Sequence, residues 1–149
     1  MTTFAFVFPG QGSQSVGMLD AWGGDAAVRH TLQEASDALG EDMATLIHAG
    51  PNEQLDLTTN TQPAMLTAGV ACYRAWMAET GMMPSVVAGH SLGEYTALVA
   101  AGALSLADAL PLVRYRAQAM QGAVAVGVGA MAAILGLEAQ AVIDGCAEV

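Results

Sequence analysis

The feature that most constrains this chain is a pentapeptide of the form G-x-S-x-G, Gly89-His90-Ser91-Leu92-Gly93, directly after the short apolar run Ser85–Ala88. The pattern is typical of a nucleophile elbow, a sharp turn from a strand into a helix that presents a serine at the end of a sheet. The two glycines leave room where two backbones come close. The first N–H groups of the helix would then face an oxyanion formed on a carbonyl that Ser91 attacks. A turn without chemistry can carry the same residues, so the rest of the chain has to decide.

Strands and helices alternate along the sequence, which predicts an α/β fold with a mainly parallel sheet and flanking helices. The aromatic run Phe4–Phe8 is predicted to be a strand buried on both faces. Ser85–Ala88 and Met131–Leu135 are predicted to be the second and third strands. Helices are expected over Asp25–Leu39, over Asp42–His48, from Gln62-Pro63 with proline in the first turn to before Gly81, from the pentapeptide to about Ala101, from the capping box Ser105–Asp108 onwards, and over Glu138–Ala147.

The charge balance disfavours one class of partner. The chain has 149 residues, four arginines, no lysine and 14 acidic residues, for a net charge of −10. Nucleic-acid binding is disfavoured because neutralising phosphates requires clustered cations. The length suffices for one domain with a core of its own.

Two further patterns bear on location. The stretch between Arg116 and Glu138 carries no charge, but four glycines interrupt it, so it is predicted to be a helix end, a glycine-rich loop and a strand rather than a membrane span. No basic segment of a signal peptide precedes the first strand. Cys72 and Cys146 lie far apart in helical patterns and are predicted to be reduced core thiols, which favours a cytoplasmic location.

A serine needs a base to become a nucleophile. In elbow enzymes that base is a histidine later in the chain. The histidines here are His30, His48 and His90, and none follows Ser91. His90 is adjacent to the serine, where side chains diverge, and the other two are predicted to lie on helix surfaces. Either Ser91 is not catalytic or its base is not among these residues.

The loop after the first strand, Gly10-Gln11-Gly12, invites comparison with a phosphate-binding loop. It lacks the G-x-G-x-x-G spacing, and without a lysine it cannot be a Walker-type loop. In elbow enzymes one oxyanion donor follows the nucleophile and the other comes from a different strand-end loop. The N–H groups of Leu92 and Gln11 are the candidates for these donors, although an ordinary turn would also account for the loop.

Three segments taken together resemble one family. Phe6–Gln14, Thr61–Ala64 and Gly89–Tyr95 are similar in sequence, order and spacing to the malonyl-CoA:acyl-carrier-protein transacylases, the stand-alone relatives of the acyltransferase domains of fatty-acid and polyketide synthases. The resemblance covers nearly the whole chain. It implies transfer of a malonyl group from malonyl-CoA to the phosphopantetheine thiol of acyl carrier protein. Coenzyme A would enter only as the thioester substrate, with no permanently bound cofactor and no metal.

The resemblance also implies roles for single residues. Ser91 matches the nucleophile that holds the malonyl group as an ester, and Gln11 and Leu92 match the residues whose main-chain N–H groups form the oxyanion hole. Arg116 matches the arginine that grips the free carboxylate, a task suited to a guanidinium because it binds a carboxylate with two hydrogen bonds. The remaining matches, which could equally be core residues, are the pocket-lining positions His90, Gln62 and Met120.

The helical pattern alone does not decide whether the side chains of the two neighbouring arginines point inward or lie at the surface. Arg116 lies near one edge of the apolar stripe of its helix and could point inward, whereas Arg114 lies beyond the opposite edge. From the residues alone, a surface position is favoured for both.

The resemblance is to the first half of a transacylase. It implies that residues 1–125 form part of an α/β-hydrolase-like acyltransferase subdomain and that residues 126–149 begin a small ferredoxin-like subdomain. Family members carry the catalytic histidine further on, so the base is expected to be absent from this chain. Two alternatives stay open: an esterase of the α/β-hydrolase class, which shares the elbow, and a non-catalytic binding fragment.

Overall fold

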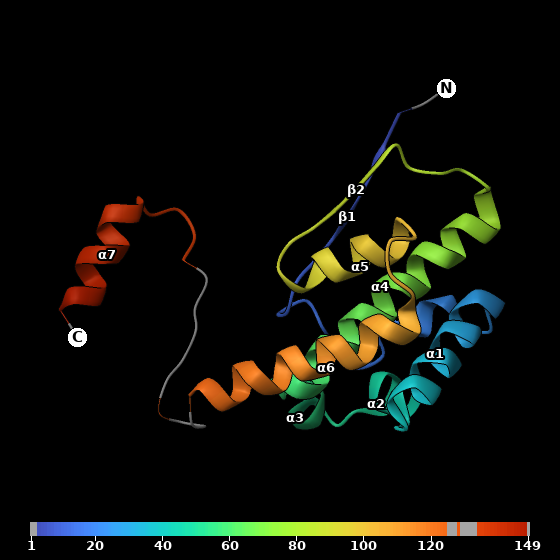
Figure 1. Ribbon diagram of the computed structural model, residues 1–149, viewed down its shortest axis with the longest axis horizontal. Helices are drawn as coiled ribbons and strands as arrows, with labels where there is room; N and C mark the ends of the chain where they lie inside the picture. The colour runs from blue at the N-terminus through green and yellow to red at the C-terminus, as the bar shows by residue number, and fades with distance from the viewer. Residues whose placement is uncertain (1–2, 125–127, 129–133, 149) are drawn as a thin grey trace.

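The computed structural model describes residues 3–124, 128 and 134–148. Two strands, β1 (Ala5–Phe8) and β2 (Val86–Gly89), pair in parallel, with Ala5 opposite Val86 and Phe8 opposite Gly89 (Figure 1). The helices are α1 (Ala26–Leu39), α2 (Met43–Ala49), α3 (Asn52–Leu55), α4 (Thr58–Thr80), α5 (Leu92–Ala100), α6 (Leu106–Ala123) and α7 (Ala139–Ala147), with a 3-10 turn, η1, at Asp20–Trp22. The predicted α/β class is confirmed, with helices in the majority.

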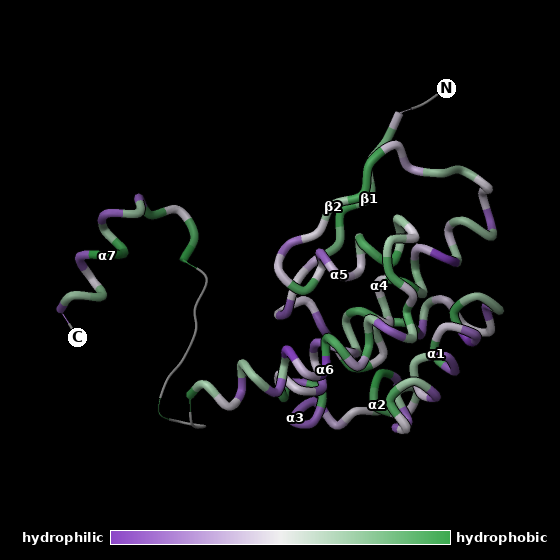
Figure 2. The backbone as a smooth tube through the Cα atoms, viewed as in Figure 1, coloured by the Kyte–Doolittle hydropathy of each residue, from purple (hydrophilic) through white to green (hydrophobic). Residues whose placement is uncertain are grey.

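Among residues 3–124, 128 and 134–148, helices cover the sheet on one face only. Side chains alternate along a strand, and the face that carries Phe6 and Phe8 packs on α4, with the Phe6 ring centroid 5.5 Å from that of Tyr73. On the other face Val7 is 72% exposed and Val86 59% exposed. The prediction that the first strand is buried on both faces is therefore wrong for the described residues, because the helices gather on one side. In Figure 2 both strands nevertheless carry hydrophobic colours.

Helices α1 and α2 begin and end where local chemistry predicts. The Asp25 carboxylate accepts the Val28 N–H at 3.0 Å, and Gly40 ends α1 in the left-handed region with φ of 66°. Asp42 caps α2 by accepting the Thr45 N–H at 2.9 Å. The hydrogen bonds that the Thr45 N–H and the Thr45 hydroxyl donate to Asp42 lower the pKa of its carboxyl below the ordinary value. The predicted bounds hold to within one residue.

Helix α4 starts earlier than predicted. It begins at Thr58, so Pro63 is its sixth residue and does not lie in the first turn. A proline there removes one helical hydrogen bond, to the carbonyl of Thr59, and the neighbouring bonds remain. The Thr61 N–H donates to the Leu57 carbonyl at 2.7 Å, and the Thr61 hydroxyl donates to that of Leu55 at 2.6 Å. These bonds secure a start that the proline pattern did not predict.

Helix α4 is also the centre of the core. It packs against α1, α5 and α6, as Figure 1 shows. The predicted start of α6 is confirmed, since Ser105 Oγ accepts the Asp108 N–H at 3.0 Å; the Asp108 carboxylate accepts the Ser105 hydroxyl rather than the Ser105 N–H of a full capping box. Its apolar stripe is buried up to one turn before the end, at Leu106, Leu110, Val113 and Ala117, whereas Met120 is 36% exposed.

The C-terminal predictions have mixed outcomes. Of the third strand, residues 131–133 lie outside the described residues, and Ile134 and Leu135 are not in a strand. Helix α7 matches its predicted range to one residue. Its Cys146 is exposed, which contradicts a core thiol, while Cys72 is half-buried and burial raises its pKa. Within residues 3–124, 128 and 134–148, no helix has the length and apolar character needed to cross a membrane.

Candidate active site

Ser91 lies in the turn between β2 and α5. Its φ is 53°, and it is the one non-glycine residue with positive φ in the part of the chain that the structure describes. That region is unfavourable for a residue with a Cβ, and such strain collects at functional sites. The Ser91 side chain is exposed, and the turn is closed by the Gly93 N–H, which donates to the His90 carbonyl at 2.8 Å.

The two glycines of the pentapeptide are required by close backbone contacts. A Cβ on Gly89 would overlap the carbonyl group of Gly93. A Cβ on Gly93 would overlap the carbonyl of Phe8, at the end of the neighbouring strand. Any larger residue at either position would force strand and helix apart, so the turn depends on both glycines.

Arg116 reaches the serine from α6. Its Nη2 donates to Ser91 Oγ at 3.0 Å, and its Nη1 donates to Gln62 Oε1 at 2.5 Å. The Arg116 guanidinium also lies over the Tyr95 ring, 5.9 Å from the centroid, within the range of a cation–π contact. Arg116 therefore points inward and is half-buried, and the surface alternative left open by the helical pattern is wrong for this residue.

Gln62 supports this arginine from α4. Its side chain is fully buried at 0% exposure, and its Nε2 donates to the Met120 sulfur at 3.3 Å. A buried amide that uses both ends fixes its partners in place, because leaving either end unpaired would cost desolvation energy. The structure thus brings Ser91, Arg116, Gln62 and Met120 into one connected group. Met120 lies at its rim rather than in the core.

The loop of residues 10–14 lies against the same turn. A Cβ on Gly10 would stand 3.0 Å from the His90 carbonyl oxygen and 3.7 Å from Ser91 Cβ. Within the described residues, the main-chain N–H groups of Gln11 and Leu92 have no hydrogen-bond partner. The structure therefore places two candidate oxyanion donors on the two segments that flank the serine.

The histidines offer Ser91 no hydrogen bond. His48 Nδ1 lies 2.6 Å from Asp20 Oδ1, and His30 is exposed on α1, as predicted for a helix surface. His90 is exposed beside the serine. Across residues 3–124, 128 and 134–148, Arg116 is the side chain that is hydrogen-bonded to Ser91 Oγ.

Comparison with known families assigns the chain. A sequence model of the acyl transferase domain matches residues 5–147. The chain belongs to the acyl transferase domain family. Among curated relatives of this acyl transferase chain, the malonyl CoA-acyl carrier protein transacylase of Escherichia coli (strain K12) is 54% identical over 149 residues, which cover 99% of the chain and 48% of that protein. The corresponding Bacillus subtilis (strain 168) protein is 49% identical over 142 residues, 95% of the chain and 44% of that protein.

Solved structures agree with this acyl transferase assignment. The acyl-carrier-protein S-malonyltransferase of Burkholderia pseudomallei 1710b superposes with a TM-score of 0.90 at 69% identity, covering 99% of the chain and 48% of that structure. A malonyl-transacylase solved in complex with a type II PKS acyl-carrier protein gives a TM-score of 0.90 at 49% identity, with the same coverage. The chain spans about half the length of the curated relatives it matches.

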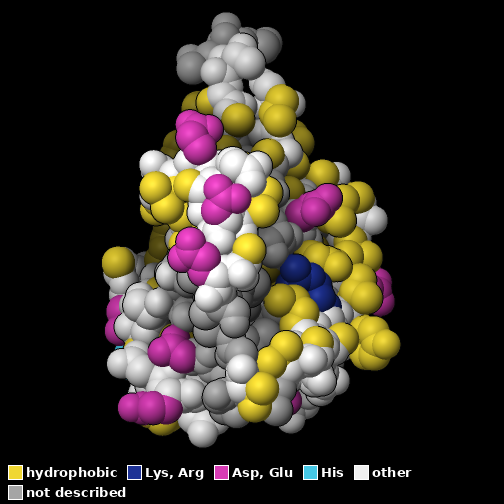
Figure 3. Space-filling view, turned by 90° about the vertical axis from the view of Figure 1, so that its left-hand side faces the viewer, with side chains coloured by type: hydrophobic (Ala, Val, Ile, Leu, Met, Phe, Trp, Pro, Cys, Tyr) yellow, Lys and Arg dark blue, Asp and Glu magenta, His cyan; other side chains and the backbone are white. Residues whose placement is uncertain are grey.

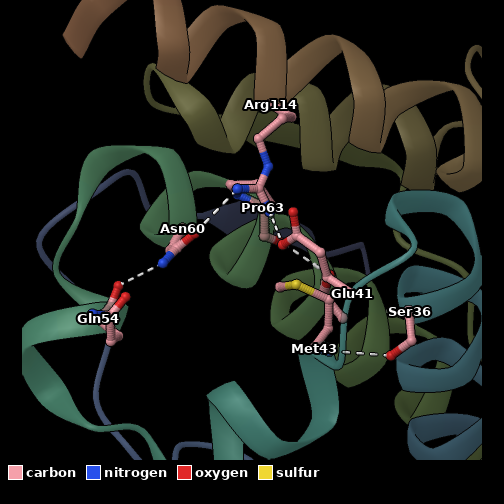
Figure 4. A network of polar contacts seen from close by, with 8 residues as sticks. Ser36, Glu41, Met43, Gln54, Asn60, Pro63 and Arg114 are labelled. Carbon is pink, nitrogen blue, oxygen red and sulfur yellow. Dashed lines mark hydrogen bonds and ion pairs between the residues drawn. The ribbon is translucent and has the colours of Figure 1, made fainter.

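The second arginine of α6 makes different contacts. Arg114 Nη1 donates to Asn60 Oδ1 at 3.1 Å, and its Nη2 pairs with the Glu41 carboxylate, as Figure 4 shows. Its side chain is only 15% exposed. Two residues along a helix are separated by about 200° around its axis, which is why Arg114 and Arg116 face different neighbours. The expectation that Arg114 could lie at the surface is wrong, because Glu41 and Asn60 meet it at the contact between α4 and α6.

Figure 3 shows how charged side chains are distributed on one face of the chain. On the face drawn in Figure 3, acidic side chains are scattered, and a single arginine-coloured patch is bordered by hydrophobic side chains. Within the described residues, no three His, Cys, Asp or Glu side chains form a group that could hold a metal ion.

Proposed function

We propose that the protein transfers a malonyl group from malonyl-CoA to the phosphopantetheine thiol of acyl carrier protein, with Ser91 as the nucleophile. The observation that carries this proposal is the Arg116 guanidinium, which lies 3.0 Å from Ser91 Oγ and is held by the buried Gln62. A guanidinium beside a strained serine suits an acyl group that ends in a carboxylate. The names of the relatives, malonyl CoA-acyl carrier protein transacylases, support the same substrate and partner.

The first half-reaction forms an ester. Ser91 Oγ attacks the thioester carbonyl carbon while a base takes its proton, and the carbonyl oxygen becomes an oxyanion near the N–H groups of Leu92 and Gln11. The C–S bond then breaks, the sulfur of coenzyme A takes the proton, and malonyl stays on Ser91. In the second half, the phosphopantetheine thiol attacks this ester and Ser91 recovers its proton. The turn would in this way act as a nucleophile elbow.

Arg116 would select the acyl group. On substrate binding its guanidinium would exchange the Ser91 hydroxyl for the malonyl carboxylate, a charged and bidentate partner. Gln62, fixed by its own burial, would keep the fork oriented, and His90 and Met120 would line the pocket. An acetyl group has no carboxylate for Arg116 and would gain nothing from it. This contact favours a transacylase over an esterase, whose neutral substrates do not use an arginine.

The same proposal includes the catalytic base, the division into subdomains and the cellular location. We expect a histidine outside the 149 residues to act as base, since none of His30, His48 and His90 is hydrogen-bonded to Ser91. Residues 1–125 would form part of an α/β-hydrolase-like subdomain, and residues 126–149 would begin a ferredoxin-like one. The enzyme would be cytoplasmic, with coenzyme A entering as the thioester substrate, no resident cofactor and no nucleic-acid or membrane partner.

The direct test is a covalent adduct. The intact protein is incubated with labelled malonyl-CoA, and the peptide that contains Ser91 is examined by mass spectrometry for a malonyl group. We expect the adduct on Ser91, its loss in Ser91→Ala, and its discharge when the phosphopantetheine-loaded carrier protein is added. No adduct on Ser91 would favour a non-catalytic fragment, and equal labelling by acetyl-CoA would favour a less selective enzyme.

A further inference from the structure

Two glutamine side chains tie the loop of residues 10–14 to the start of α4. Gln14 Nε2 donates to Asp56 Oδ1 at 2.9 Å, and Gln14 Oε1 accepts the Gly12 N–H at 2.8 Å. Gln11 Nε2 donates to Thr58 Oγ1 at 3.0 Å. Gln14 therefore uses both ends of its amide, one inside its own loop and one across to the residues that lead into α4.

Apart from the close contact of Gly10 with the turn at His90 and Ser91, little else fixes this loop. In the part of the chain that the structure describes, residues 10–14 make no hydrogen bond from main chain to main chain. Gly12 has φ of 107°, a conformation that leaves the backbone without regular structure. Since a loop is held by its packing and its few bonds, the side-chain bonds of Gln11 and Gln14 decide where its N–H groups lie.

The loop and Arg116 are both bonded to side chains in the first turns of α4, at different residues. Thr58, which accepts from the Gln11 side chain, lies four residues before Gln62, so the two share one face of α4. The first turns of α4 thus contact both the loop, through Thr58, and the Arg116 guanidinium, through Gln62. A change at the loop anchor can therefore be separated from a change at Gln62, which contacts Arg116 itself.

We propose that Gln14 is a positioning residue: through its bond to Asp56 it holds the main-chain N–H of Gln11 beside Ser91, where the oxyanion forms. This inference rests on the proposed function, and it adds a residue that touches neither substrate nor serine. An oxyanion donor must lie within about 3 Å of the developing charge, so a loop that drifts loses transition-state binding while substrate binding is kept.

The test is a set of variants of the intact protein, read by malonyl transfer kinetics and by hydrogen exchange at the Gly12 amide. Gln14→Ala removes both hydrogen bonds of the Gln14 side chain. It is expected to lower kcat by about three- to tenfold, to leave KM within about twofold, and to speed Gly12 exchange. Gln14→Glu places two carboxylates face to face and should show the same defect. Adding Asp56→Asn to Gln14→Glu reverses the polarity of the bond and should restore both readouts.

The matched control is Gln33→Ala. Gln33 Nε2 donates to Asp37 Oδ1 at 2.8 Å on α1, the same Gln–Asp bond away from the loop, and its loss should change neither readout. Faster Gly12 exchange in Gln14→Ala with unchanged kcat would overturn the proposal, and so would a double variant no better than Gln14→Glu.

Failure of the proposed function would be visible separately. If the unmodified protein gave no malonyl ester on Ser91, the proposed function would fail. Hydrogen exchange at the Gly12 amide would then be the remaining test of whether the Gln14–Asp56 bond holds the loop. Faster exchange in Gln14→Ala with recovery in the double variant would support this role. Unchanged exchange in Gln14→Ala would overturn it.

Discussion

At the scale of single residues, the site depends on groups whose partners are already in place before substrate binds. Arg116 bonds to Ser91 and Gln62, and Gln62 bonds to Met120. Because Gln62 is buried, the arginine does not have to be ordered on binding, and the entropy cost of fixing its long side chain is already met in folding.

The first residue-scale prediction concerns selectivity. Arg116→Ala should lower kcat/KM for malonyl-CoA by about 30- to 1000-fold, the usual cost of removing one partner of a desolvated charge pair. The slow reaction with acetyl-CoA should change little, because that acyl group carries no carboxylate. Parallel assays with both thioesters measure the ratio, and Arg29→Ala, whose arginine bonds only to the Gly24 carbonyl among the described residues, is the control. An unchanged ratio would remove Arg116 from the substrate site.

The second prediction concerns Gly93. Gly93→Ala should destabilise the protein by about 3 kcal/mol or more, because its Cβ would overlap the Phe8 carbonyl and the backbone must shift. Gly122→Ala is the matched control, since no atom lies within 4 Å of its Cβ in helix α6. It should be neutral or add up to about 1 kcal/mol through helix propensity. Urea unfolding of both variants measures this difference, and equal stabilities would contradict the close approach of β1 and α5.

At the scale of elements, helix bounds follow from capping side chains. The Asp42 carboxylate accepts the Thr45 N–H at 2.9 Å, and this bond lowers its pKa below the ordinary 3.8. The unfolded chain therefore binds a proton at Asp42 at higher pH than the folded chain does. Its contribution to stability is complete above the ordinary pKa and is lost as the pH falls through the lowered one.

The third prediction follows from this cap. Asp42→Ala should lower the Tm near neutral pH, and the difference from the unmodified protein should shrink as the pH falls below about 4. Asp42→Asn keeps an uncharged acceptor for the same N–H, so it should retain most of the Tm with less dependence on acid. Thermal melts of the three proteins between neutral and acidic pH provide the measurement. If the Tm difference between Asp42→Ala and the unmodified protein grew as the pH fell, the predicted direction of the pH dependence would be wrong.

At the scale of the whole molecule, Arg114 joins parts that are distant in sequence. It lies on α6 and bonds to Asn60 on α4 and to Glu41 in the turn after α1 (Figure 4). These contacts bind three elements around the core that α4 organises.

The fourth prediction uses this position. Arg114→Ala should cost about 1–3 kcal/mol of unfolding free energy, because Asn60 and Glu41 lose a charged and largely buried partner. Arg116→Ala should cost less in stability and more in activity. Chemical denaturation together with the malonyl assay separates the two arginines. If Arg114→Ala abolished malonyl preference while its stability stayed unchanged, the roles given to Arg114 in stability and to Arg116 in selectivity would be wrong.

Sequence reasoning predicted what short segments determine. The cap at Ser105 is predictable because it acts within one turn, and the helix starts at Asp25 and Asp42 are predicted to within one residue for the same local reason. The early start of α4 was not predicted. The Thr61 bonds that secure it go to the carbonyls of Leu55 and Leu57, which the spacing of the apolar residues does not indicate. Of the site, the turn around Ser91 could be predicted from its glycines. The group around Arg116 could be named only through the family resemblance.

The sequence by itself thus determined the strand–serine–helix turn, the helix caps and the parallel α/β class, because each depends on neighbouring residues and on steric limits of the backbone. Only the tertiary structure decided which arginine meets Ser91, which face of the sheet is covered and that Gln14 holds the loop through Asp56. Those outcomes depend on where α4 and α6 pack. The contacts join residues 25 to 54 positions apart, and no local pattern encodes their distance.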